Sequence, residues 1–160
     1  MRIIKDHSIG TDDWVRLADD APLPVTGDVI VSYARWSAEV EVLRGRAGRV
    51  GICLAPDDDV TDIVAHLARF ELVAIDFPTF GDGRGYSQAR LLRDAYGFGG
   101  ELRAVGDVLR DQLDFMARCG FDSFEIRADQ DPAQALEAFN EFSVRYQPAA
   151  DGVPPIWTLR

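Results

Sequence analysis

Apolar residues gather along the chain in five short runs, separated by segments in which they recur every three or four positions. The runs cover residues 29–34, 50–54, 72–75, 101–105 and 123–126, and their length and composition predict β-strands. Residues 50–54 are nearly all apolar, which is typical of a strand that is buried on both faces. Residues 123–126 alternate between polar and apolar types, which favours a strand at the edge of the sheet.

The segments between these runs have the spacing of amphipathic helices. Val60, Ile63 and Leu67 lie on one helical face, and Asp59 before them suits an N-cap. Strands that alternate with helices pair in parallel through right-handed crossovers. The expected fold is α/β, with five βα units and a mostly parallel sheet. We favour an open three-layer sheet over part of a (β/α) barrel, closed or paired through a dimer, because a closed barrel normally takes about eight such units.

Proline positions divide the chain into three parts. Residues 1–27 are expected to form an N-terminal arm that packs through Trp14, since Pro22 and Pro24 break any helix there. Residues 28–147 form the βα domain. Residues 148–160 are rich in proline and are expected to form an extended C-terminal tail. Apolar residues on such a tail can add a strand to the sheet of a partner or of a sister subunit.

A loop rich in glycine follows the third predicted strand. Gly81, Gly83 and Gly85 allow positive φ and a close approach of the backbone to a bound group. A helix N-terminus after the loop, together with the charges of Arg84 and Arg90, suits a small anion. The alternative is a tight surface turn in which Arg84 is solvated or paired with Asp82. The expected ligand-binding residues are Asp82, Gly83, Arg84, Gly85, Tyr86, Ser87, Arg90, Arg103 and Gln112.

This loop does not match the motifs of nucleotide-binding proteins. The dinucleotide fingerprint is G-x-G-x-x-G directly after a strand, whereas here the spacing is G-x-G-x-G and four residues, 77–80, come first. The Lys-Ser/Thr pair of a P-loop is missing as well. The sequence therefore assigns no cofactor.

Two carboxylates are the candidate catalytic residues. Asp76 ends the third strand and Asp107 follows the fourth, so the two approach each other if those strands are neighbours. Paired acids can then divide the roles of acid and base. In the alternative, Asp107 caps the next helix. Arg103 lies within the fourth strand and needs a carboxylate partner, for which Asp76 is a candidate. The amide of Gln112 is expected to bond to the backbone of the glycine loop.

Composition narrows the range of partners. The chain has 17 Lys and Arg residues against 27 Asp and Glu residues, a net charge of −10, which disfavours nucleic acid. Cys53 and Cys119 lie in apolar runs and are expected to be small buried hydrophobic residues. The two histidines lack the spacing of metal ligands, so no metal site is expected. No apolar stretch is long enough to span a membrane, and residues 1–6 lack a signal core, so we expect a cytoplasmic protein.

Several motifs resemble a bacterial family of unknown function whose members are often labelled oxidoreductases of sulfite reduction. The resemblance extends over residues 29–142 and is densest at residues 76–87, 102–109, 111–112 and 118–122. It implies genes beside those of assimilatory sulfite reductase. It also implies that the site includes residues 76–87, 103, 106, 107, 111 and 112. Two cysteines are too few to hold the four-iron cluster of the reductase itself, so an accessory role is implied.

Three functions remain open at this point. The first is an accessory protein of assimilatory sulfite reduction with a small-anion or cofactor pocket at residues 81–87. The second is a βα enzyme that uses Asp76 or Asp107 as acid or base on a small anionic substrate. The third is a non-catalytic adaptor that docks on the sulfite reductase. The sequence leaves open whether the protein is catalytic and whether it forms a homodimer.

Overall fold

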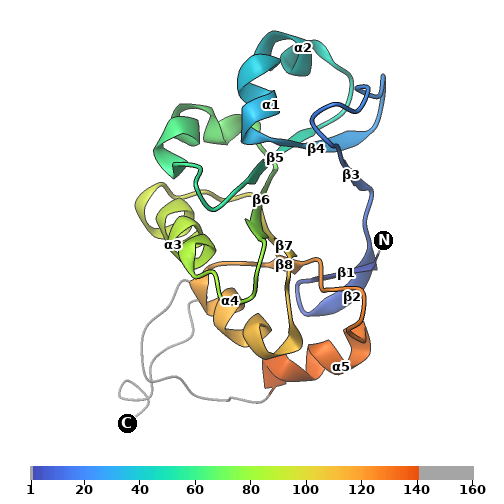
Figure 1. The fold of residues 1–160 in the computed structure, drawn as a ribbon, viewed down its shortest axis with the longest axis vertical. Coiled ribbons are helices and arrows are strands. Elements are labelled where there is room, and N and C mark those ends of the chain that lie inside the picture. Colours follow the sequence, from blue (N-terminus) through green and yellow to red (C-terminus); the bar gives the residue numbers. More distant parts are fainter. Residues whose placement is uncertain (1, 141–160) are drawn as a thin grey trace.

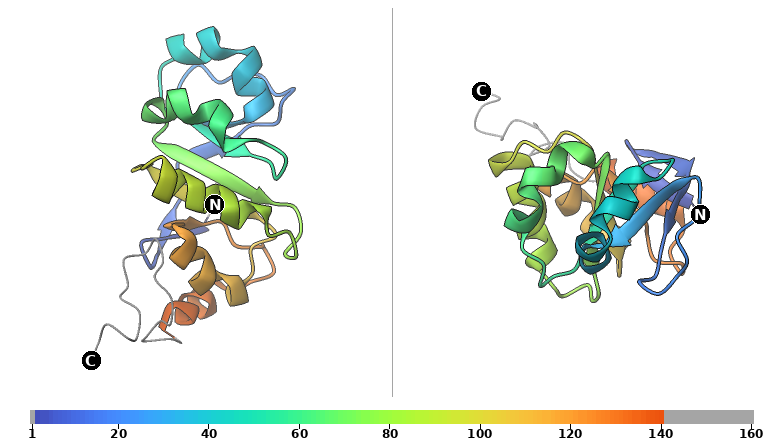
Figure 2. Two further views of the ribbon diagram at one scale, coloured as in Figure 1. Left: turned by 90° about the vertical axis from the view of Figure 1, so that its left-hand side faces the viewer. Right: turned by 90° about the horizontal axis from the view of Figure 1, so that it is seen from above.

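The computed structural model describes residues 2–140, which form one curved sheet with helices along its outer side (Figures 1 and 2). Within these residues the sheet has eight strands in the order β2-β1-β8-β7-β6-β5-β4-β3. The strands are β1 (Arg2–Lys5), β2 (Ser8–Thr11), β3 (Trp14–Arg16), β4 (Asp28–Ser32), β5 (Val50–Leu54), β6 (Leu72–Phe77), β7 (Glu101–Gly106) and β8 (Ser123–Phe124).

The sheet is mixed and curls into a half-barrel, so the expected open three-layer sheet of five βα units is wrong (Figure 2). Strands β3 to β8 pair in parallel with their neighbours, but β1 pairs antiparallel with both β8 and β2. The difference arises in the segment 1–27, which was expected to be an arm. It supplies three strands, and it extends the sheet at both edges.

Strand β8 is an internal strand, which corrects the expectation that it lies at the edge. It pairs with β7 on one side, where Ala104 faces Phe124, and with β1 on the other, where Ile4 faces Phe124. The side chain of Phe124 is buried against the helices while Ser123 is buried on the opposite face. The alternation that suggested an edge strand instead reflects two chemically different faces.

Short helices cover the outer face of the sheet. They are α1 (Tyr33–Ala38), α2 (Val40–Gly45), η1 (Val60–Arg69), α3 (Arg84–Arg90), η2 (Leu91–Ala95), η3 (Arg110–Gln112), α4 (Leu113–Cys119), α5 (Pro132–Glu137) and η4 (Ala138–Asn140). Asp59 caps η1 as expected and Asp131 caps α5, each accepting a hydrogen bond from a backbone N–H of the first turn. Within residues 2–140 none of these helices has the length and apolar character that a membrane crossing requires.

The two faces of the half-barrel differ in chemistry. On the outer face, side chains such as Val31, Ile52 and Ile75 are fully buried beneath the helices and form the main core. Strand geometry sends every second residue to the inner face. There a smaller apolar cluster of Ile30, Leu72, Ala74 and Val105 packs with Trp14 and Cys53. Charged residues border this inner cluster at both ends of the strands.

Candidate functional site

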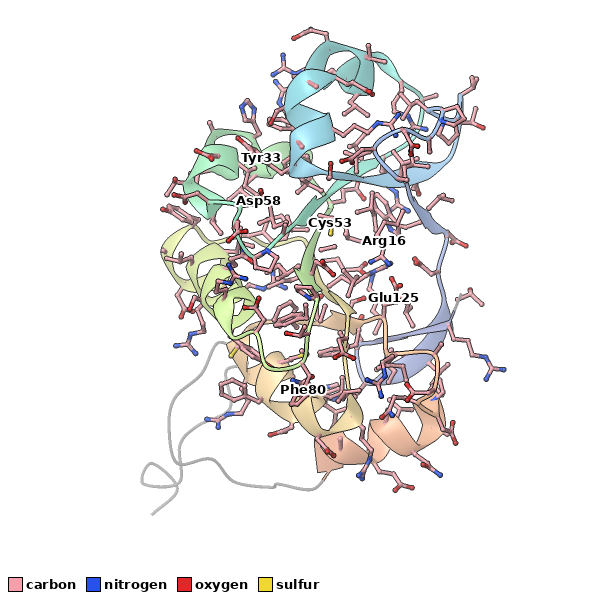
Figure 3. The ribbon with its side chains drawn as sticks, viewed as in Figure 1. Arg16, Tyr33, Cys53, Asp58, Phe80 and Glu125 are labelled. Carbon is pink, nitrogen blue, oxygen red and sulfur yellow. The ribbon has the colours of Figure 1, made fainter. Side chains whose placement is uncertain are left out.

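A cavity of about 520 Å³ opens on the inner face at the carboxyl ends of β4, β5 and β6. We call it the carboxyl-end cavity. In parallel α/β proteins, ligands usually bind at this end of the strands. Figure 3 shows several of its residues and the neighbouring Glu125. The lining consists of Arg16, Leu17, Ala18, Asp19, Ser32, Tyr33, Ala34, Cys53, Ala55, Asp58 and Asp76.

Asp76 is the chemically distinctive residue of this cavity. It lies near the end of β6 and points to the inner face, where it is partly buried. Its carboxylate forms no hydrogen bond or ion pair with any residue in the range 2–140. Burial raises the pKa of Asp76, and the positive charge of Arg16 opposes this rise. Asp76 is therefore an accessible carboxyl group whose capacity to accept hydrogen bonds is unused.

The backbone of Gly106 lies directly against Asp76. Gly106 has a φ of +93°, and a Cβ added to it would lie 2.6 Å from Oδ1 of Asp76 and 2.5 Å from the carbonyl oxygen of Phe77. Only glycine fits both the conformation and the space. The carboxylate is thus bordered on one side by close backbone and on the other by the open cavity.

The other charges of the cavity make it acidic. Arg16 donates to Oε1 of Glu125 at 3.3 Å, so its charge is already paired. Asp19 accepts a hydrogen bond of 2.6 Å from the hydroxyl of Ser32. With Asp58 and Asp76, the lining holds three aspartates against one arginine. Such a lining favours a neutral or cationic ligand that has N–H or O–H donors.

Cys53 lies beside Asp76 in surroundings that disfavour its thiolate form. Burial first, and the negative charge of Asp76 second, raise the pKa of its thiol to about 12. Because the thiolate is the reactive form, the protonated thiol is unreactive near neutral pH. The chemistry that this cavity can perform is therefore centred on the carboxyl group of Asp76.

A network of hydrogen bonds holds the rim of the cavity. Gln88 is buried and donates to the carbonyl oxygens of Ala55 and Asp58 at 2.8 and 2.9 Å. Asp58 in turn accepts from the backbone N–H of Ala55 at 2.7 Å. These bonds fix the turn after β5 at the rim of the cavity.

The glycine loop is closed by its own ion pairs. Arg84 donates to both oxygens of Asp82, at 3.0 and 2.7 Å, and to Asp57 at 2.5 Å. The hydrogen bonds from Arg84 lower the pKa of Asp82. This is the alternative of a tight turn with a paired Arg84. Gly85 packs on Phe77, since an added Cβ would lie 2.6 Å from that ring.

The expected positive φ angles do not occur in this loop. Gly81, Gly83 and Gly85 are absent from the glycines with positive φ, and a Cβ on Gly81 or Gly83 would contact nothing within 4 Å. Ser87 is exposed to solvent in the first turns of α3. Since α3 begins at Arg84, the loop continues into the helix without a turn that would require glycine for its dihedral angles.

Tyr86 and Arg90 face away from the carboxyl-end cavity. Tyr86 packs between Phe77 and Phe115, with ring centroids 5.2 and 5.0 Å apart. Arg90 forms an ion pair of 3.0 Å with Asp94 on the same helical segment. Both residues therefore have structural partners within the described part of the chain.

Asp107 and Gln112 hold the loop from the other side. Asp107 accepts from the backbone N–H of Phe80 at 3.0 Å and from Arg127 at 2.8 Å, and it caps neither η3 nor α4. Gln112 donates to the carbonyl oxygen of Phe80 at 2.8 Å, which confirms the predicted bond to the loop backbone. Asp107 does not line the cavity, so the structure does not bring the two candidate acids together around one site.

Arg103 has partners other than the expected Asp76. Its guanidinium, 1% exposed, bonds to Asp12 and Glu101 at 2.7 Å each and to Ser123 at 3.1 Å. These residues lie towards the amino ends of the strands, where a smaller hollow of about 270 Å³ includes Asp12, Glu101 and Arg103. The prediction that Asp76 neutralises Arg103 is wrong.

The sequence pattern missed most of the residues that surround Asp76. Arg16 and Asp19 were assigned to the arm, and Tyr33, which was placed within a strand, is the first residue of α1. The signal that could have found Arg16 is the pair of strand-forming residues Trp14 and Val15 directly before it. The tail at residues 148–160 lies outside the described residues. Among residues 2–140, no group of three or more His, Cys, Asp or Glu side chains is arranged to hold a metal ion.

Comparison with known proteins shows the family of the chain. Residues 51–157 match the family model described as "Bacterial protein of unknown function (DUF934)". The match covers more than half of the 160 residues and includes Asp76 and the glycine loop. None of the curated proteins and none of the solved structures matches the chain. The protein belongs to the DUF934 family.

Proposed function

We propose that this member of the DUF934 family binds a small molecule in the carboxyl-end cavity and that Asp76 acts on it as a proton acceptor or donor. The observation that carries the proposal is a partly buried carboxylate without a bonding partner among residues 2–140, placed at the carboxyl end of a central strand. Its raised pKa keeps it closer to neutrality than an exposed aspartate, which suits acid–base work.

The volume and the lining of the cavity also support the binding of a small molecule. A volume of about 520 Å³ falls in the range of pockets that hold small molecules. Its lining includes the apolar side chain of Leu17 and the thiol of Cys53 beside the polar groups. A ligand with an N–H or O–H donor would satisfy Asp76 and gain from the negative charge of the lining. Proton transfer to Asp76 would then neutralise a carboxylate that burial disfavours.

The biological setting we propose is an accessory role in assimilatory sulfite reduction. Support for it comes from the family resemblance, which implies genes beside those of the reductase. A small anion at residues 81–87 stays a prediction, but Arg84 would first have to leave Asp82 and Asp57. An anionic substrate at Asp76 is disfavoured by the three aspartates of the lining.

A ligand screen with matched variants tests the proposal. Thermal shifts with sulfite, sulfate, phosphate, NADPH, FAD and tetrapyrroles, and with neutral and cationic compounds, are measured for wild type, Asp76→Asn, Arg84→Ala and Asp107→Asn. We expect a stabilising ligand whose effect is weakened by Asp76→Asn and unchanged by Arg84→Ala and Asp107→Asn. A ligand whose effect depends on Arg84 and not on Asp76 would move the site to the glycine loop.

A second candidate function is docking on the sulfite reductase. Phe80 and Phe115 are 62% and 54% exposed. Gln112 lies one helical turn before Phe115 and bonds to the backbone of Phe80, so it connects the two segments. Exposed aromatic residues are enriched at protein interfaces. If this surface docks, a Phe80→Ser and Phe115→Ser double variant loses co-purification with the reductase while Asp76→Asn retains it. Deletion of residues 148–160 tests the tail in the same assay.

A further inference from the structure

Four arginines converge on a hollow of about 330 Å³ at the opposite end of the sheet. Arg44, Arg46, Arg49 and Arg69 line it, and Glu71 is the one acid in the lining. The whole chain has a net charge of −10, so this local excess of positive charge runs against its composition. We call this hollow the arginine pocket.

Parallel βα topology explains why these residues meet. Arg44 lies in the last turn of α2 and Arg69 in the last turn of η1, while Arg49 directly precedes β5. In a βα unit the helix C-terminus lies at the same edge of the sheet as the start of the next strand. Arg46 closes the turn between them, donating to the carbonyl oxygens of Gly27 and Pro24 at 2.8 and 3.1 Å.

The four charges are not equally available to a ligand. Arg49 is saturated, since it bonds to Asp28 through two nitrogens and to Glu71 at 3.0 Å. Arg44 has an exposed pair with Glu41 at 3.1 Å, which contributes little in water. Arg69 is exposed and has no hydrogen bond or ion pair with any residue from 2 to 140. Arg44 and Arg69 are therefore the residues that can bind an anion.

The pocket also has an aromatic wall. Trp36 and Phe70 line it, 8% and 5% exposed, with ring centroids 5.5 Å apart. Leu43 adds a third apolar side chain. A surface that combines apolar side chains with guanidinium groups at its rim suits a ligand with both characters.

We propose that the arginine pocket binds a small organic anion that joins a phosphate or carboxylate head to a flat apolar part. The head group bonds to Arg44 and Arg69, and the apolar part lies against Trp36 and Phe70. This site is independent of Asp76, because it lies on the helix side at the amino ends of the strands, and the carboxyl-end cavity shares none of its residues.

A purely structural role explains only part of this arrangement. Basic residues in the last turn of a helix stabilise the helix dipole, which accounts for Arg44 and Arg69 individually. That role requires neither a hollow nor aromatic side chains beside the charges. It also predicts no difference between an aromatic anion and an aromatic alcohol, which an experiment can measure.

Phenyl phosphate is the probe, with benzyl alcohol as its neutral counterpart. The indole N–H resonances of the three tryptophans are followed by NMR during titration of the full chain. We expect phenyl phosphate to shift the Trp36 resonance, assigned with a Trp36→Phe variant, in a saturable manner. In an Arg44→Gln and Arg69→Gln double variant, binding should weaken about tenfold or more, since two charge-assisted hydrogen bonds are lost.

Arg2→Gln is the matched control, because it removes an exposed arginine of strand β1 that does not line the arginine pocket. It should bind phenyl phosphate as the wild type does. Benzyl alcohol should bind at least about tenfold more weakly than phenyl phosphate. Equal affinity of the double variant, equal affinity of benzyl alcohol, or an unmoved Trp36 resonance would each overturn the proposal. Unchanged backbone spectra of the double variant verify that it is folded.

Discussion

Arg103 and Asp76 are two charged residues on the same face of the same sheet, and they differ in whether their charge has a bonding partner within residues 2–140. Strands β6 and β7 are neighbours, and Arg103 lies opposite Ala74, two residues before Asp76 on the same face. Arg103 is fully buried and its bonds go to Asp12, Glu101 and Ser123. Asp76 is partly buried and has no such bond within residues 2–140. A saturated charge holds the fold, whereas an unsatisfied one is available to a ligand.

Arg103 and Asp76 differ because the amino ends of the strands are covered by other parts of the chain, whereas the carboxyl ends open into a cavity. At the amino end, Asp12 follows the β1–β2 hairpin and reaches Arg103, and Lys5 of β1 pairs with Glu101. At the carboxyl end the corresponding space is the open cavity. Each of the following predictions breaks or sharpens this contrast, and they are ordered by the size of the expected effect.

Arg103→Met should give the largest loss of stability. It leaves the nearly buried carboxylate of Asp12 without its ion pair and Glu101 with Lys5 alone, and loss of a buried partner typically lowers the free energy of unfolding by about 3–5 kcal/mol. Urea denaturation followed by circular dichroism measures it, with Arg90→Met, which removes a partly exposed ion pair, as the control expected to change stability by about 0.5 kcal/mol or less. If Arg103→Met does not fold, the single change Asp12→Asn should still show a clear loss. If Arg103→Met and Asp12→Asn were both as stable as the wild type, the ion pairs of Arg103 would not stabilise the fold.

Gly106→Ala should have the next largest effect. The φ of +93° and the contacts with Phe77 and Asp76 predict a loss of roughly 1–3 kcal/mol in the free energy of unfolding. Gly99→Ala is the control, since its Cβ would contact nothing within 4 Å and its φ is not positive. Similar stabilities of the two alanine variants would contradict the close contact between Gly106 and Asp76.

Asp76→Asn should increase stability at neutral pH, by about 1 kcal/mol or less. The raised pKa means that the folded protein binds the proton more tightly than the unfolded chain, whose value is near 3.8. The stabilisation from this group is complete below the unfolded pKa and is lost as the pH rises through the folded pKa. The difference between variant and wild type should therefore vanish in acid. A variant that is less stable at pH 7 would show that Asp76 has a structural partner.

Arg84→Gln should have the smallest effect. Its hydrogen-bonded pairs with Asp82 and Asp57 lie at the surface, and such pairs contribute little to stability in water. Thermal stabilisation by sulfite, sulfate or phosphate is measured on the same variant. If these anions stabilise Arg84→Gln as much as the wild type, the glycine loop is not the anion site. If the stabilisation is lost in Arg84→Gln, the anion binds at the glycine loop and not in the carboxyl-end cavity.

The parallel core of the fold could be predicted from the sequence, but its outer strands could not. Strands β5, β6 and β7 are apolar runs that lie between helices, so local periodicity identifies them. Strands β1, β2 and β3 have three or four residues each, and apart from Ile3 and Ile4 their residues are exposed or half-buried. Their place depends on pairing with β8 and β4, which are distant in sequence. Curvature follows from that pairing and leaves no local signal.

The candidate site shows the same division. The position of Asp76 at a strand end made it identifiable, because parallel strands present their carboxyl ends together. Its surroundings were not predictable, since Arg16 comes from the missed strand β3. The glycine loop was predicted as a ligand site from residue types alone. Those types also fit a turn closed by Arg84 and Asp82, and only the geometry separates the two.

Among residues 2–140, β2 and β3 are the outer strands of the half-barrel, and each pairs on one side only, so each keeps one row of backbone N–H and C=O groups without a strand partner in that range. Such rows are templates for strand addition and hence for fibril growth, which closed barrels avoid. Here the two rows are four and three residues long, too short to template a stable added strand. A half-barrel can thus avoid aggregation through its outer strands because these strands are short.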